Sequence, residues 1–216
     1  QGIVKGLFNH HKFRDSVSLS GVNSINWARI VAQVVYYFTS AVALGAPARE
    51  VDFTVPTGNF GDIFAGYVAK RMGLPVRRLR IAANINDILA RTLKTGIYEV
   101  KQVHATTSPS MDIQISSNFE RYLFEASDRD ADFVRSSMTS LIATGSFELG
   151  RTGSRLKQDF AAVSASEADV ADAIRRTKTA YGYVLDPHTA CGVVAAEKTL
   201  PRSATPRVVL ATAHPA

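Results

Sequence analysis

Short β-branched runs alternate with longer helical patterns along most of this chain of 216 residues, and this alternation restricts the possible folds more than any other feature. Each helical pattern begins near a capping residue and ends near glycine or proline, as helices in globular proteins do. Strands that alternate with helices form βαβ units, so we expect an α/β fold in which helices cover both faces of a mostly parallel sheet. The residues 1–216 are expected to form mostly one domain. The predicted strands are 51–55, 79–83, 98–104, 160–164 and 208–212, and the predicted helices are 25–44, 60–72, 87–94, 118–127, 131–143, 166–181 and 187–198.

The composition is that of a globular protein with a sizeable core, because 46% of the residues are hydrophobic and 20% are charged. No apolar run approaches the ~20 residues that a membrane-spanning helix needs. Residues 1–15 lack the apolar centre of a secretory signal. The single cysteine, Cys191, excludes an internal disulfide and is typical of a reducing compartment. We therefore expect a cytoplasmic protein that does not enter the membrane.

The formal charge is +6 and the isoelectric point is about 9.6, which raises the question of anionic partners. The basic residues are spread along the chain, and the densest cluster, 77–80, alternates with an apolar residue as in a strand. No basic run is interleaved with aromatic residues in the way that single-strand binding requires. The sequence therefore favours a small anionic ligand over nucleic acid or a membrane surface.

A glycine-containing turn at 57–62 joins the predicted strand 51–55 to the predicted helix 60–72. The first N–H groups of a helix have no partners within it, and the helix dipole makes its start electropositive. Glycine at two positions permits close approach of a ligand to the backbone. We therefore predict an anion site at Gly58, Asn59, Phe60, Gly61 and Asp62. The alternative is a glycine-rich turn that binds nothing, and the turn matches neither the dinucleotide-binding nor the Walker pattern.

Asp62 is the acidic member of this turn. A carboxylate aimed at a phosphate would repel it. We therefore expect Asp62 to offer its backbone N–H and to turn its side chain away to cap the helix. His188 and Cys191 lie three residues apart, as some metal ligands do, but no second pair accompanies them. We interpret both as structural residues and expect no metal site.

Six motifs follow one another along the chain. They are VNSINWAR (22–29), VPTGNFGD (55–62), SPSMDI (108–113), SSNFER (116–121), DPHTA (186–190) and ATAHPA (211–216). Together they resemble the threonine synthase family, in the order that the family has, from about Val4 to Ala216. Six separate matches in one order make the resemblance specific, whereas any one of them alone would be weak.

Threonine synthases are pyridoxal 5′-phosphate (PLP) enzymes of fold type II, the fold of tryptophan synthase β, and convert O-phospho-L-homoserine and water into L-threonine and phosphate. The resemblance implies that the turn Gly58–Asp62 surrounds the phosphate of PLP. It also implies that Thr212, which we place at the end of the last strand, faces the pyridine nitrogen. Asn23, Ser24 and Arg29 are implied to hold the phosphate of the substrate, and a helix start with a guanidinium fork suits that task.

The resemblance further implies a lysine that forms a Schiff base with PLP, within a Lys-Asp motif upstream of Gln1. Nothing in the chain matches that motif, so no catalytic residue is assigned to it. The chain is expected to be the central and C-terminal, cofactor-binding part of the enzyme, and to be inactive alone. Two alternatives stay open, namely another type II enzyme such as a serine or threonine dehydratase, and a non-catalytic module that binds PLP or phosphate. The motif 22–29 argues against a dehydratase, because dehydratases have no substrate phosphate to hold.

Overall fold

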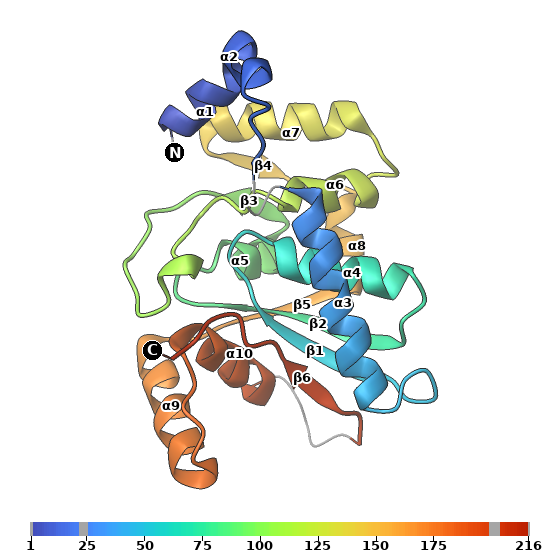
Figure 1. Cartoon of the computed structure of the whole chain (residues 1–216), viewed down its shortest axis with the longest axis vertical. Coiled ribbons are helices and arrows are strands. Elements are labelled where there is room, and N and C mark those ends of the chain that lie inside the picture. Colours follow the sequence, from blue (N-terminus) through green and yellow to red (C-terminus); the bar gives the residue numbers. More distant parts are fainter. Residues whose placement is uncertain (1, 22–25, 199–203, 216) are drawn as a thin grey trace.

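Four parallel strands form the central sheet of the molecule. They are β1 (Val51–Pro56), β2 (Val76–Ala83), β5 (Phe160–Ser164) and β6 (Arg207–Val209). Their order is β5-β2-β1-β6, and every neighbouring pair runs in parallel (Figure 1). The predicted α/β fold with a parallel sheet is therefore confirmed. The computed structural model describes residues 2–21, 26–198 and 204–215.

Helices cover both faces of this sheet (Figure 1). One face carries α3 (Trp27–Ala43) and α4 (Gly61–Arg71), and the other carries α10 (Pro187–Lys198), against which α9 (Glu167–Tyr181) packs. All six residues of β1 are buried, as expected of a parallel strand that is covered on both faces. The register of the strands places their carboxyl ends along one edge, where ligands of such folds bind.

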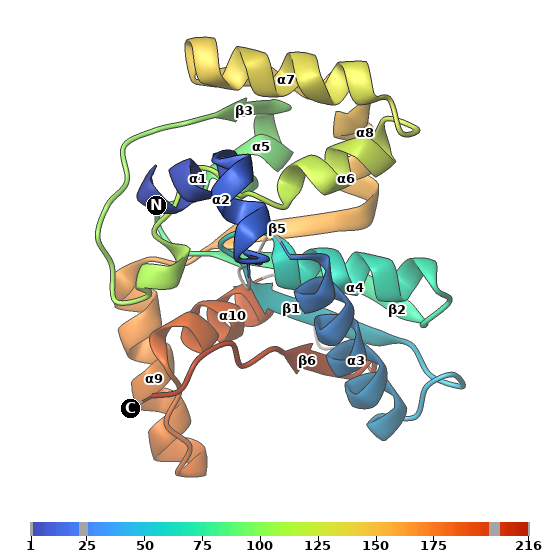
Figure 2. The same cartoon turned by 45° about the horizontal axis from the view of Figure 1, so that its top comes forward.

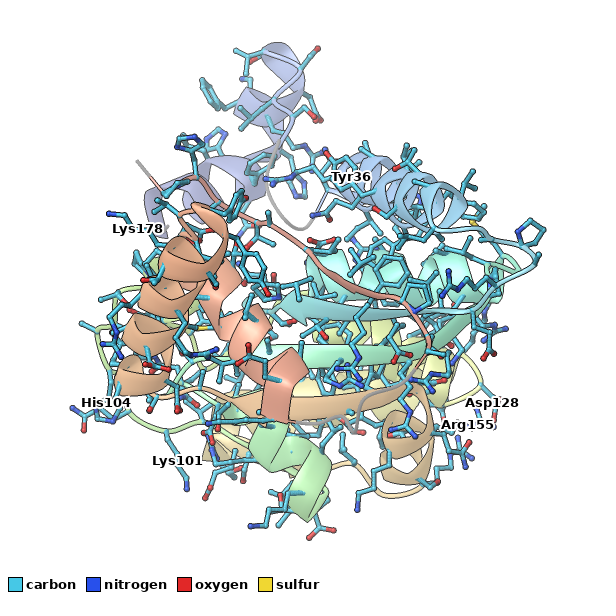
Figure 3. All side chains as sticks on the ribbon, turned by 90° about the horizontal axis from the view of Figure 1, so that it is seen from below. Tyr36, Lys101, His104, Asp128, Arg155 and Lys178 are labelled. Atoms are coloured by element: carbon cyan, nitrogen blue, oxygen red, sulfur yellow. The ribbon has the colours of Figure 1, made fainter. Side chains whose placement is uncertain are left out.

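A further group of elements lies toward the β5 edge of the sheet. It consists of α5 (Ile88–Thr95), β3 (Ile97–Glu99), α6 (Phe119–Ala126), α7 (Ala131–Thr144), β4 (Ser146–Glu148) and α8 (Thr152–Asp159). Of these, α5 and α8 contact β5. β3 and β4 pair in antiparallel fashion, and α7 lies farthest from the central sheet (Figure 2). Asp128 and Arg155 form a two-pronged ion pair at 2.7 and 3.0 Å that joins the end of α6 to α8 (Figure 3). The remaining helices are α1 (Gly2–Asn9), α2 (His11–Ser16) and the short 3₁₀ helix η1 (Pro109–Met111).

An aromatic cluster anchors the turn that follows β1. The ring of Phe60 lies 5.2 Å from that of Phe119 and 5.4 Å from that of Phe160, in edge-to-face contact with both. Tyr122 contacts all three rings. Burial of one such ring stabilises the folded state by about 1.5–3 kcal/mol. The turn is therefore fixed to the core by the side chain at its centre.

Most predicted helices are confirmed within one or two residues. The capping box predicted at the start of α9 is present, since Ser166 Oγ accepts the Asp169 N–H at 3.2 Å and the Asp169 carboxylate accepts the Ser166 N–H at 3.0 Å. α10 begins and ends where predicted. Residue 25, the predicted start of the first long helix, lies outside the described residues, and that helix is described from Trp27.

Three strand predictions are wrong in length. The strand predicted over 79–83 begins three residues earlier, at Val76. Of the strand predicted over 98–104, only the first residues belong to β3, and residues 100–108 form no helix or strand. There the side chain of Asn86, and not a neighbouring strand, binds both the N–H and the C=O of His104, at 2.8 Å each. The last strand ends at Val209 and not at Thr212. The Leu210 N–H still bonds to Thr54 O at 3.1 Å, but Pro56 has no N–H to continue this ladder.

Candidate active site

A pocket of about 610 Å³ lies at the carboxyl edge of the sheet, beyond the ends of β1 and β6. Segments that are far apart in the sequence form its walls. Its lining consists of Arg29, Gln33 and Tyr36 from α3 (Tyr36 is labelled in Figure 3), residues 56–63 around the turn after β1, Ser110 and Met111 of η1, His188 of α10, and residues 210–213 after β6. The predicted turn, Arg29 and Thr212 are therefore brought together in one cavity.

Residues 58–62 of the turn after β1 offer hydrogen-bond donors to this pocket. Within the described part of the chain, the N–H groups of residues 58–62 take part in no hydrogen bond. They lie at the start of α4, where the helix dipole is positive. Unpaired backbone N–H groups at a helix start form a site for an anion such as phosphate.

The carbonyl groups of the same turn are occupied elsewhere. Gly58 O accepts the Ser116 hydroxyl at 2.7 Å. Asn59 O accepts both the backbone N–H and the side-chain amide of Asn118, at 3.0 and 3.1 Å. These hydrogen bonds to the carbonyl groups fix the conformation of the turn, while its N–H groups stay available to a ligand. The motif 116–121 therefore supports the turn, a role that we could not assign from the sequence.

Two residues of the turn, Phe60 and Gly58, have unusual backbone requirements. Phe60 adopts a left-handed conformation, with φ of 64°, which costs a residue with a side chain about 1–2 kcal/mol. Its buried ring holds it there. A Cβ on Gly58 would lie 2.6 Å from the carbonyl oxygen of Ser110, so only glycine fits between the turn and η1.

The helix cap predicted for Asp62 is not formed. The carboxylate of Asp62 does not cap α4, whose N-cap is Phe60 without a side-chain hydrogen bond. It lies instead toward α3, where the Tyr37 hydroxyl donates to Asp62 O at 2.8 Å and contacts Oδ1 at 3.4 Å. Burial raises the pKa of Asp62 to about 6, against a smaller lowering effect of the Tyr37 hydrogen bond. The sequence could not show this, because Tyr37 is 25 residues away.

The residues predicted to bind substrate are only partly described. Asn23 and Ser24 lie outside the described residues. Asn26 caps α3 by accepting the Ala28 N–H at 2.9 Å, and Arg29 follows on an exposed face that lines the pocket. Thr212 also lines the pocket, but from the exposed segment after β6 and not from a strand end.

His188, which we interpreted as structural, is a wall residue of the pocket. Its Nδ1 lies 3.1 Å from Asp186 Oδ1, and its Nε2 accepts the Ser110 N–H at 3.2 Å. Its companion Cys191 is buried in a hydrophobic cluster that α9 and α10 share with Met111 of η1. The sequence could not show that His188 reaches the pocket wall, because its partner Ser110 is 78 residues away.

The described part of the chain carries no candidate metal centre. No group of three or more His, Cys, Asp or Glu side chains there is arranged to hold a metal ion. None of the helices over the described residues has the length and apolar character that crossing a bilayer requires.

No protein-family model matches the chain. The chain is 45% identical to the threonine synthase of Pseudomonas aeruginosa over all of its 216 residues, which correspond to 46% of that relative. The PLP-bound threonine synthase of Brucella melitensis is 58% identical and superposes with a TM-score of 0.94 over the whole of this chain and 46% of its own. A threonine deaminase, from T.th., is 16% identical and shares the fold alone, with a TM-score of 0.55 over 84% of this chain and 52% of its own. The chain thus spans about half the length of the curated relatives it matches.

The parallel sheet, covered on both faces and bearing a donor-lined pocket at its carboxyl edge, is the fold of the PLP-dependent enzymes of type II. Within that class, the chain is similar along its whole length to threonine synthases, about half of whose length it covers.

Proposed function

We propose that this chain is the cofactor-binding part of a threonine synthase, which converts O-phospho-L-homoserine and water into L-threonine and phosphate. The substrate is a small phosphorylated amino acid, and we place the reaction in the cytoplasm. In the family that this chain resembles, the lysine that carries PLP lies upstream of the segment matched here. We propose that this protein likewise has its lysine and its phosphate-binding turn in separate regions.

The observation that carries this proposal is the convergence of Arg29, the turn 58–62 and Thr212 on one pocket of about 610 Å³. A pocket that holds a cofactor and a substrate, each with a phosphate, needs anion-binding groups in two places. The free N–H groups of the turn supply one, and the guanidinium of Arg29 supplies the other.

The shape and donors of the turn fit the phosphate of PLP. Gly58 lets the turn pack closely against η1, and the N–H groups of residues 58–62 are available as donors. When bound, PLP supplies an electron sink that stabilises negative charge on the substrate carbon atoms. Thr212 would offer a neutral hydroxyl to the pyridine nitrogen. Arg29, with Asn23 and Ser24, would hold the substrate phosphate, so that this group is oriented for departure.

The test is phosphate release from O-phosphohomoserine by the intact protein and by an Arg29→Gln variant. Loss of a charge-assisted contact to phosphate should raise KM for O-phosphohomoserine by about 10- to 100-fold and leave PLP binding unchanged. The matched control is Arg135→Gln, an exposed arginine on α7 that should change neither quantity. An unchanged KM in Arg29→Gln would contradict the assignment of Arg29, and the absence of phosphate release in the wild type would contradict the function.

A further inference from the structure

His188 connects two parts of the pocket wall that are far apart in the sequence. Its ring is mostly buried, with 12% of the side chain exposed. Nδ1 lies 3.1 Å from the carboxylate of Asp186, and Nε2 lies 3.2 Å from the backbone nitrogen of Ser110, 78 residues away. Both nitrogens of the ring therefore have a partner.

The partners determine which nitrogen carries the proton. The Asp186 carboxylate caps α10 by accepting the N–H groups of His188 and Thr189 at 2.8 and 3.2 Å, and it also accepts the Thr189 hydroxyl. Burial opposes its charge, but these hydrogen bonds outweigh burial and hold the pKa of Asp186 below its usual value. An ionised carboxylate only accepts, so Nδ1 carries the proton and Nε2 offers its lone pair to the Ser110 N–H.

The bond from Ser110 to His188 lies at the middle of η1. Asn84 binds the residues that flank η1 on both sides, because its amide donates to Ser108 Oγ at 2.9 Å and to Asp112 Oδ1 at 2.7 Å. Between them, the Ser110 N–H bonds to His188, and the Ser110 carbonyl rests against Gly58 of the phosphate turn. A shift of Ser110 would therefore move the group that touches the turn.

We infer that His188 is a positioning residue of the cofactor pocket, which holds Ser110 of η1 against the turn 58–62 by accepting the Ser110 N–H. This inference rests on the proposed function, because it assigns the turn to the phosphate of PLP. His188 acts on the turn through Ser110 and needs no contact with the reacting atoms.

Two substitutions of His188 each remove one of its two side-chain hydrogen bonds and keep the other. In His188→Gln, the side-chain oxygen can reach the position of Nε2 and accept the Ser110 N–H, while the bond to Asp186 is lost. In His188→Asn, the shorter amide can donate to Asp186 in place of Nδ1, while the bond to Ser110 is lost. The backbone cap of α10 by Asp186 remains in both variants, so both are expected to fold.

The experiment measures the affinity of the intact apoprotein for PLP by absorbance titration, with thermal unfolding of each variant alongside. We expect His188→Asn to bind PLP about three- to tenfold more weakly, as loss of one hydrogen bond implies, and His188→Gln to remain within about twofold of the wild type. Wild-type affinity in His188→Asn, or an equal loss in both variants, would overturn the inference. A wild-type protein that binds no PLP would overturn the proposed function as well, so the two failures are distinct.

Discussion

Gly58 is the position at which the structure makes its sharpest prediction. The Cβ of alanine there would lie 2.6 Å from Ser110 O and 3.5 Å from Met111 Cα. Both atoms belong to the backbone of η1, so no side chain can rotate out of the way. The φ angle of Gly58 is not in the left-handed region, so the expected cost of Gly58→Ala comes from this contact and not from backbone strain.

The loss of stability expected for Gly58→Ala depends on how firmly η1 and the turn are held in place. η1 is held by Asn84 at both ends and by His188 in its middle, and the turn is held by Ser116 and Asn118. Forcing two fixed segments apart for one extra carbon atom typically costs about 1–3 kcal/mol. For a chain of 216 residues, that corresponds to a fall in Tm of roughly 2–12 °C. The N–H groups of the turn move with the segment, so PLP binding should weaken as well.

The assay is thermal unfolding of the apoprotein together with PLP titration. The matched control is Gly6→Ala on α1, where an added Cβ would meet nothing within 4 Å. That change should leave PLP affinity unaltered and raise stability by up to about 1 kcal/mol, because alanine favours helix more than glycine does. If Gly58→Ala melted and bound PLP like the wild type, the close packing of η1 on the turn would be refuted.

Two further predictions concern titratable groups, the partly buried Asp62 and the buried Cys191. Burial raises the pKa of Asp62 from 3.8 to about 6, so the folded protein keeps this proton up to about pH 6, whereas the unfolded chain loses it near pH 4. Stability should therefore fall as pH rises through this window, and Asp62→Asn should regain on the order of 2 kcal/mol at about pH 7.5 and little at about pH 4, measured by urea unfolding. An equal effect at both pH values would contradict the role of the carboxylate charge. Burial raises the pKa of the Cys191 thiol to about 11, so the native protein should react with a thiol reagent at about pH 8 far more slowly than the urea-unfolded protein. Equal rates would show that the thiol is accessible.

Local signals predicted the regular elements well where each signal acts within a few residues. The capping box at Ser166 and Asp169, and Pro187 at the first turn of α10, are short-range patterns, and both helices begin where they indicate. Residues 100–104 were misassigned as strand; the backbone of His104 there bonds to the side chain of Asn86 and not to a neighbouring strand. The helices α1, α2 and α8 and the strand β4 are each eight residues long or shorter, and we did not predict them.

The sequence by itself determined the class of fold and the turn 58–62, since alternation of elements and a glycine turn before a helix are properties of neighbouring residues. It also carried the resemblance to threonine synthases. Only the tertiary structure decided which residues share the pocket, because parallel strands bring their carboxyl ends together whatever their separation along the chain. It removed Asp62 from the helix cap, ended β6 before Thr212, and placed His188 against Ser110. Each of these depends on a contact between segments that the sequence keeps apart.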